Sequence, residues 1–227
     1  MSTNGILSRL SRPDCLLLEP HLEKVRLPLG KRLERPGRRI EHIYFLQRGI
    51  ASVVADGPDE RGIEVGLIGR EGMTGLAVVM DSDRSPYETF VQIEGEALCM
   101  PASNLRKRIE ESPTLRASFL RYGHSFVVQL ASTALANGRS KIEERLARWL
   151  LMAHDRIDGD EIALTHELLA LMLGVRRPGV SDALKLLEKR GLIQMDRRAI
   201  VISDREGLKK VSRAYGAPEA EYQRLFD

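Results

Sequence analysis

A face of hydrogen-bonding side chains is predicted on a helix that begins near Arg177. These side chains are three or four residues apart and are those of Arg177, Ser181, Lys185 and Glu188. The opposite face of the helix is apolar and consists of Val180, Ala183, Leu184 and Leu187. Long polar side chains near the start of a helix with a buried back can bind base edges in the major groove of DNA. An ordinary solvated amphipathic helix is the alternative that this pattern alone leaves open.

The residues before this helix have the form of the first half of a helix-turn-helix. Thr165 supplies an N-cap hydroxyl, and Gly174 falls where the turn needs a residue free to adopt positive φ. Pro178 falls in the first turn of the second helix, where its missing N–H costs nothing. The buried face predicted for the first helix consists of Leu168, Leu169, Met172 and Leu173. Together these positions favour DNA binding over the solvated-helix alternative.

The composition is that of a chain long enough for two domains. It has 227 residues, of which 43% are hydrophobic and 30% charged. The net charge is only +3, but residues 165–200 carry seven basic and four acidic side chains, enough to contact a few phosphates. We expect neither a membrane span nor export, because there is no run of about 18 apolar residues and the N-terminal segment is charged. Cys15 and Cys99 form no CxxC pair, which suits a reducing cytoplasm.

The N-terminal half of the chain is predicted to be all-β. Between residues 25 and 101, short apolar stretches are broken by Gly, Pro and Asp at close intervals, a rhythm typical of an antiparallel barrel or jelly roll. One or two short helices are expected over residues 1–24. Another helix is expected over Ala102–Glu111.

A long helix is expected after Pro113, with two seams at heptad spacing. The first seam is Leu115, Phe119, Tyr122, Phe126, Gln129, Thr133 and Ala136, and the second is Leu120, Gly123, Val127, Leu130 and Ala134. Since a β domain covers only one face, we expect one seam to pack on that domain and the other on a second copy, which makes a two-fold dimer. The alternative is a central helix buried within one chain. The residues assigned to dimerisation are Leu115, Phe119, Tyr122, Phe126, Gln129, Leu130 and Thr133.

The remaining elements complete the expected α+β fold. Asn137–Arg139 is expected to break the long helix and to act as a hinge, and Ser140 to Glu143 has the form of a capping box. The segment from Leu192 to Ile202 is predicted to form a β-hairpin wing whose Arg197 and Arg198 can reach phosphate. A last helix near residues 204–215 and a polar tail would follow. The expected domains are residues 1–112 (β-barrel with N-terminal helices), 113–137 (dimerisation helix) and 138–227 (winged helix-turn-helix).

A β-barrel, a long dimer helix, a hinge and a winged helix-turn-helix, in this order, resemble the CRP/FNR superfamily of bacterial transcription regulators. The resemblance covers nearly the whole chain and is most specific in residues 164–193, LTHELLALMLGVRRPGVSDALKLLEKRGLI. It implies a cytoplasmic homodimer that binds double-stranded DNA at near-palindromic operators and contacts RNA polymerase. The candidate DNA-binding residues are Thr165, His166, Arg176, Arg177, Pro178, Gly179, Ser181, Asp182, Lys185, Arg197 and Arg198.

The sequence departs from two family patterns. The family's best-known base-reading pattern is Arg-Glu-x-x-x-Arg, but here Pro178 follows Arg177 and Asp182 holds the second arginine's place, so we expect a different operator. Family members that bind cyclic AMP have a glutamate where this chain has Leu76, and an Arg-Ser pair aligned here with Pro86 to Thr89; only a register shift would bring Arg84-Ser85 into place. Because charge-assisted hydrogen bonds are the strong ones, we expect no tight binding of cyclic AMP.

Other classes of function have weaker support. His166-Glu167 begins like a zinc-binding HExxH, but Ala170 replaces the second histidine, and we assign no catalytic, cofactor or metal residue. Two cysteines are too few for an iron–sulfur cluster. Haem ligation by His21, His42, His124 or His154, a redox role for Cys99 and an unknown small-molecule effector in the barrel stay open. The rival to a DNA-binding regulator is a cyclic-nucleotide-binding-like module that acts through protein contacts, and the winged helix-turn-helix argues against it.

Overall fold

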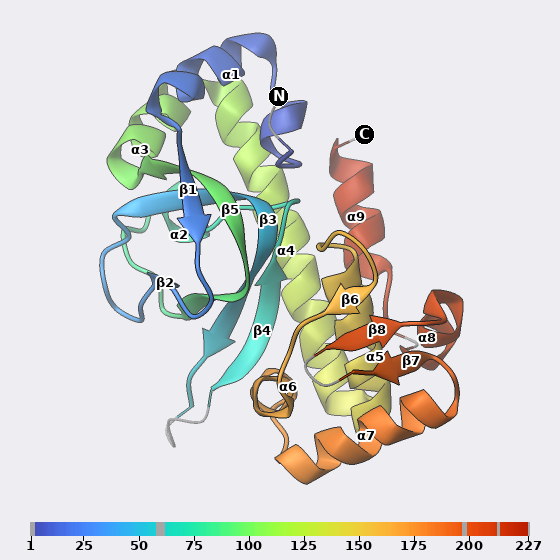
Figure 1. Ribbon diagram of the computed structural model, residues 1–227. Helices are drawn as coiled ribbons and strands as arrows, with labels where there is room; N and C mark the ends of the chain where they lie inside the picture. Colours follow the sequence, from blue (N-terminus) through green and yellow to red (C-terminus); the bar gives the residue numbers. More distant parts are fainter. Residues whose placement is uncertain (1–2, 58–61, 197–198, 213, 227) are drawn as a thin grey trace.

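The computed structural model describes residues 3–57, 62–196, 199–212 and 214–226. An N-terminal sheet domain and a C-terminal helical domain lie along one long helix, α4 (Figure 1). The N-terminal residues form a 3-10 turn (Leu7–Arg9), α1 (Arg12–Leu18) and a second 3-10 turn (Glu19–His21). The predicted short helices are therefore present, although the chain is already a strand from Glu23. The α+β fold class is confirmed.

The sheet domain is one antiparallel sheet of five strands, with the order β1-β5-β3-β4 and with β2 also paired to β5. The strands are β1 (Glu23–Leu27), β2 (Arg32–Glu34), β3 (His42–Ala55), β4 (Ile63–Ile68) and β5 (Glu88–Pro101). A short helix, α2 (Leu76–Val79), lies between β4 and β5, and α3 (Ala102–Glu111) follows β5 with the predicted bounds.

Two glycines allow the long strands β3 and β5 to bend across each other. Their pairing shifts register at three points between Leu46 and Ala51. Gly49 has φ +83°, and a Cβ there would come within 2.5 Å of the Ile93 carbonyl oxygen. A Cβ on Gly95 would collide with the carbonyl of Arg48. The backbones approach more closely than a side chain permits, so the sheet curls at this crossing.

The helix α4 (Pro113–Arg139) covers the open side of the curled sheet. Ser112 caps its start by accepting the N–H of Leu115, 3.2 Å away. Phe119 is fully buried, and its ring centroid lies 5.9 Å from that of Phe45 in β3. Gln129 accepts from the Leu67 N–H at 2.6 Å and donates to the Leu67 carbonyl at 3.2 Å, so it binds α4 to strand β4.

The expected break of the long helix at Asn137–Arg139 was wrong by a few residues. α4 continues through all three, and the chain becomes extended at Ser140, with ψ 149°. Gly138 has open space around it and nothing forces the helix to end there. The capping box is also displaced by one residue: the N-cap of α5 (Ile142–His154) is Lys141, whose N–H donates to Glu144 at 3.0 Å.

The helical domain is a three-stranded sheet packed with four helices. Its remaining elements are β6 (Glu161–Ile162), α6 (His166–Leu173), α7 (Arg177–Lys189), β7 (Ile193–Met195), β8 (Ile200–Ile202) and α8 (Arg205–Ser212). The strands are antiparallel in the order β6-β8-β7, so the predicted hairpin is confirmed as β7–β8. Arg197 and Arg198 lie outside the described residues.

The end of the chain differs from the expected polar tail. Residues Ala217–Phe226 form a further helix, α9, which runs beside α4 and against the sheet domain rather than with the helical domain (Figure 1). The Tyr222 hydroxyl donates to the Glu71 carbonyl at 2.9 Å, and Glu221 pairs with His124 of α4 at 3.0 Å. The C-terminal segment therefore joins the two halves of the molecule.

A buried carboxyl group connects the two domains. Glu64 of β4 accepts a hydrogen bond from the Trp149 indole N–H of α5 at 2.6 Å, and its other oxygen bonds Ser52 of β3. Leu67 belongs to the same buried apolar cluster as Trp149 and Met172. Burial raises the pKa of Glu64 to about 8, although the hydrogen bonds from Ser52 and Trp149 act to lower it.

The substitution Glu64→Gln should remove a pH dependence of stability. The unfolded carboxyl ionises near pH 4.5 but the folded one near 8. The contribution of Glu64 to the free energy of unfolding is therefore fully present below the pKa of the unfolded state. It is lost as pH rises through the pKa of the folded state. Urea unfolding midpoints of the wild type should fall between about pH 5 and about pH 8 by more than those of Glu64→Gln. The exposed Glu110→Gln serves as control, and parallel curves for wild type and Glu64→Gln would contradict the assignment.

Candidate DNA-binding surface

The two faces of α7 differ in burial as the sequence pattern predicts. Val180 and Leu187 are fully buried in the core of the helical domain. Arg177, Lys185 and Glu188 are exposed on the other face. α7 lies at the edge of the molecule opposite the N-terminal helices, and its polar face is not packed against the chain's own interior (Figure 1).

The helix-turn-helix geometry comes from residues at the ends of α6. The Thr165 hydroxyl accepts the N–H of Leu168 at 3.2 Å and caps the helix start. Gly174 has φ +58°, the left-handed conformation that ends α6. Arg145 of α5 donates to the Leu173 carbonyl at this end, where a cation favours the helix dipole. These contacts fix the angle at which α7 leaves the turn.

Two pairs of polar side chains connect the starts of α6 and α7. Nδ1 of His166 lies 3.1 Å from the Ser181 hydroxyl, and both residues are half-buried. Nη1 of Arg177 lies 3.1 Å from the Glu167 carboxylate, with about two-thirds of each side chain exposed. An exposed ion pair of this kind contributes little free energy, so Arg177 can exchange Glu167 for a partner on DNA at small cost.

The other sequence-predicted DNA-binding residues occupy different environments. Arg176 is the exposed N-cap residue of α7, Pro178 lies in its first turn, and Asp182 is exposed. Gly179 lies on the inner side: a Cβ there would come within 3.2 Å of Ile142 in α5. The Gly179 N–H already donates to the Arg176 carbonyl at 3.0 Å.

A groove of about 570 Å³ runs beside this surface, between the starts of α6 and α7 and the end of β7. Thr165, His166 and Arg177 line it, and so does Leu29 of the sheet domain, which is 63% exposed. The wing is held to α7 because the Met195 N–H donates to Glu188 at 3.0 Å. Sequence reasoning missed Leu29, because no local pattern shows that the loop after β1 reaches the helix-turn-helix.

The sheet domain contains a polar site that its own carboxylate fills. Glu34 of β2 accepts the Gly75 N–H at 2.6 Å, at the start of α2, and the hydroxyls of Ser85 and Thr89 lie beside its carboxylate. Burial nevertheless raises the pKa of Glu34 above its usual range. The Gly75 N–H in this corner is therefore already used by Glu34, a side chain of the protein itself. The residue that follows Gly75 is the apolar Leu76.

Most of the residues predicted to form a dimer seam on α4 are buried within the chain itself. Of the residues assigned to dimerisation, Leu115, Phe119, Tyr122, Phe126 and Gln129 are all at least 91% buried against the sheet domain, and Leu130 and Thr133 are half-buried. The exposed positions recur with alternating spacings of four and three residues and are Leu120, His124, Val127, Ala131, Ala134 and Gly138. The surface available to a second copy is therefore close to the second seam, not the first.

Metal binding and a redox role for Cys99, which the sequence raised, have little support in the described part of the structure. In the ranges given above, no three His, Cys, Asp or Glu side chains are grouped as metal ligands. Burial raises the pKa of the Cys99 thiol, which disfavours the reactive thiolate. None of the helices in the described part of the chain is long and apolar enough to cross a membrane.

Family models match both halves of the chain. The cyclic nucleotide-binding domain model matches residues 24–112, and the Crp-like helix-turn-helix domain model matches residues 144–211. A sheet domain of the first kind, a long helix and a DNA-binding domain of the second kind define a class of transcription regulator. The chain belongs to the CRP/FNR family of these regulators.

Alignments with similar proteins cover most of the chain. The CRP-like cAMP-activated global transcriptional regulator of Mycobacterium tuberculosis is 23% identical over 216 residues, which are 92% of this chain and 96% of that protein. Two solved structures share the fold. FixK2 from Bradyrhizobium japonicum has a TM-score of 0.73 at 18% identity and covers 84% of this chain and 96% of its own. A CRP-family transcriptional regulator from Thermus thermophilus, TTHB099, has a TM-score of 0.70 at 20% identity and covers 84% and 97%.

Replacement of Arg177 by alanine should weaken binding to the preferred operator by about 1–3 kcal/mol and relax specificity at one base pair. The reason is that a guanidinium at the start of α7 can make a bidentate contact with a guanine edge. Affinities for the operator and for its single-base variants, measured at one salt concentration, test this. His166→Ala is the comparison: it should weaken binding to all sequences alike, and equal effects of both variants on specificity would undercut the assignment.

Proposed function

We propose that this protein regulates transcription as a homodimer that binds near-palindromic DNA sites without requiring cyclic AMP. The observation that carries the proposal is the exposed polar face of α7, which is held beside the wing and backed by a complete apolar core. In a two-fold dimer, two such helices enter successive major grooves about 34 Å apart. The activity belongs in the cytoplasm, where DNA and RNA polymerase are accessible, and RNA polymerase is the expected partner of a bound dimer.

The exposed seam of α4 supports the dimer. Leu120 and Val127 of the seam are 42% and 52% exposed, and Leu135 beside it is 61% exposed; they are three of the seven large apolar side chains found exposed in the described part of the chain. The spacing along the seam is that of a coiled coil, and the small side chains of Ala131 and Ala134 permit close approach of a second helix. A parallel partner on this seam leaves α7 uncovered.

A charge in the middle of the seam should separate the dimer. We expect Val127→Glu to shift the molar mass measured by light scattering after gel filtration from two chains to one, because two carboxylates would face each other in an apolar contact. DNA affinity should fall with it, since only one half-site remains. Leu16→Glu, at an exposed apolar position of α1 (59% exposed), is the matched control and should stay dimeric. A dimeric Val127→Glu protein would contradict the seam.

The site of Glu34 supports independence from cyclic AMP. Its carboxylate already accepts from the Gly75 N–H, and the hydroxyls of Ser85 and Thr89 lie beside it. A cyclic phosphate in this corner would have to displace a carboxylate with the same charge and would find Leu76 in place of a carboxylate partner for the ribose. Like charges in one buried site repel strongly. The relative from Mycobacterium tuberculosis is named cAMP-activated, and the proposal separates this chain from it in that respect.

Titration calorimetry tests this directly. Cyclic AMP added to the wild-type protein should give no saturable heat at ligand concentrations up to about 1 mM. The relative from Mycobacterium tuberculosis, measured alongside, serves as the positive control. Binding at micromolar concentration would contradict independence from cyclic AMP, while leaving DNA binding untouched.

A further inference from the structure

An exposed methionine of the sheet domain lies beside the exposed seam of α4. Met80 follows α2 directly, and its side chain is 52% exposed. A Cβ atom built on Gly123 of α4 would lie 3.1 Å from Cε of Met80 and 3.7 Å from the side chain of Leu76. Met80 therefore occupies the space beside α4 that a larger side chain at position 123 would take.

The burial of Gly123 shows that this contact adjoins the seam. Gly123 belongs to the second heptad series of the helix, three residues after Leu120 and four before Val127. Both of these neighbours are exposed, whereas Gly123 is buried. Its cover comes from Leu76 and Met80. The apolar surface of the seam thus continues from α4 onto α2.

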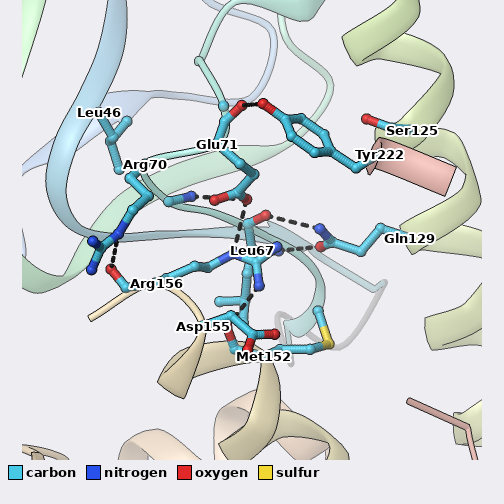
Figure 2. A network of polar contacts seen from close by, with 12 residues as sticks. Leu46, Leu67, Arg70, Glu71, Ser125, Gln129, Met152, Asp155, Arg156 and Tyr222 are labelled. Atoms are coloured by element: carbon cyan, nitrogen blue, oxygen red, sulfur yellow. Dashed lines mark hydrogen bonds and ion pairs between the residues drawn. The ribbon is translucent and has the colours of Figure 1, made fainter. Parts of the chain in front are cut away.

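The remaining sides of α4 are closed by contacts within the chain. Toward the sheet, Gln129 bonds both the N–H and the carbonyl of Leu67 (Figure 2). Along another side lies α9, whose Tyr222 donates to the Glu71 carbonyl (Figure 2). In the described part of the chain, the strip of α4 between α9 and α2 is left for a second helix, and Met80 forms one edge of that strip.

Exposed apolar side chains gather on this strip. Seven large apolar side chains are exposed among the described residues. Four of them lie on α4 or at the end of α2, and these are Met80, Leu120, Val127 and Leu135. Apolar groups that gather in one place mark contact surfaces, whereas scattered ones need no explanation. A second copy docked on the seam would reach Met80 as well as Leu120 and Val127.

The position of Met80 depends on how α2 is held. α2 is a single turn, and the Met80 N–H closes it on the Leu76 carbonyl at 3.1 Å. At the start of the turn, Gly75 has φ +76° and donates its N–H to the Glu34 carboxylate at 2.6 Å. A Cβ on Gly75 would collide with Ile43, so the turn has no room to slide toward β3. Glu34 is thus the side chain that holds the first residue of this turn.

We propose that Met80 is part of the homodimer interface and that Glu34 is its positioning residue, because Glu34 holds the start of the turn that places Met80 beside the seam. The occupant of this surface is a second copy of the chain, so the inference rests on the proposed dimer. It adds a contact from the sheet domain: α4 of one copy packs on α4 and on Met80 of the other. An unbranched thioether suits this contact because it adapts to irregular apolar gaps. The affinity of the dimer thereby depends on a carboxylate of the sheet domain.

A charge at position 80 tests the surface. Met80→Glu should raise the dimer dissociation constant, measured by sedimentation equilibrium, by roughly tenfold or more, because a carboxylate would be buried against apolar side chains. Leu16→Glu is the control, at a position of similar exposure (59%) on α1, and should dimerise as the wild type does. An unchanged dissociation constant in Met80→Glu would overturn the inference.

A double-mutant cycle tests the positioning role of Glu34. Glu34→Ala removes the acceptor of the Gly75 N–H, whereas Glu34→Gln keeps an acceptor oxygen. We expect Glu34→Ala to weaken dimerisation by roughly fivefold or more and Glu34→Gln to stay close to the wild type. In a Met80→Ala background, Glu34→Ala should have little further effect, because it acts through Met80. Equal losses from Glu34→Ala in both backgrounds would contradict that role.

Hydrogen exchange tests the same contact without a substitution in the sheet domain, which matters if Glu34→Ala does not fold. The backbone N–H groups of residues 76–81 are compared between the wild-type dimer and the Val127→Glu monomer. We expect slower exchange in the dimer, since the partner covers Met80 and restrains local opening of the turn. Equal exchange rates in the two proteins would overturn the inference, because α2 would then lie outside the interface.

These measurements separate the inference from the proposed function. A dimer that Val127→Glu dissociates but Met80→Glu leaves intact keeps the seam and refutes the role of Met80. The reverse result refutes the seam and keeps Met80 in the interface. A wild-type protein that is monomeric at every concentration refutes both.

Discussion

The long helix α4 has to cover apolar surface on more than one side, and the positions of the other elements follow from this requirement. On one side Phe119 and Leu115 fill the opening of the curled sheet. On a second side α9 lies along the helix and brings Tyr222 and Phe226 to the same cluster. The third side, around Val127, is exposed in the single chain. Burial of apolar surface is the main favourable term in folding, so the same helix packs on both the sheet and α9.

The two domains are joined by buried contacts rather than by a flexible linker alone. Strand β4 contributes Leu67 to the core of the helical domain, and the Met172 sulfur of α6 lies 3.5 Å from the Ser52 hydroxyl of β3. The polar group at this contact is a carboxyl whose burial favours its neutral form, and it accepts hydrogen bonds from the Ser52 hydroxyl and the Trp149 indole. A neutral acid avoids the desolvation cost of a buried ion, but it makes the contact sensitive to whatever changes its ionisation. The orientation of α7 relative to the sheet therefore depends on a few side chains.

Local patterns predicted the local parts of this structure. The N-cap at Thr165, the left-handed Gly174 and the two faces of α7 are properties of short stretches, and the structure has them all. The end of α4 was harder to predict from the sequence, because Gly138 permits a helix to end there without requiring it. Most residues assigned to dimerisation are buried within the chain, because both seams keep heptad spacing and only the packing of the sheet on Phe119 distinguishes them.

The features that sequence reasoning missed depend on contacts between distant residues. The segment after Tyr215 is short and rich in polar residues, which resembles a solvated tail, and only its contacts with Glu71 and His124 show why it is a packed helix. In the same way, no pattern in the sequence indicates that Glu34 meets Gly75. Such sites are assembled by topology, and periodicity carries no information about them.

The position of α9 has a consequence for the synthesis of the chain. Helix α9 covers part of the sheet domain, which precedes it in the chain: the Tyr222 ring lies beneath Arg9, and its hydroxyl donates to the Glu71 carbonyl. Domains generally fold in order from the N-terminus during translation. Here the sheet domain is synthesised before α9 and keeps an uncovered flank until α9 has left the exit tunnel. A nascent chain stalled before α9 is synthesised would present that bare flank to chaperones.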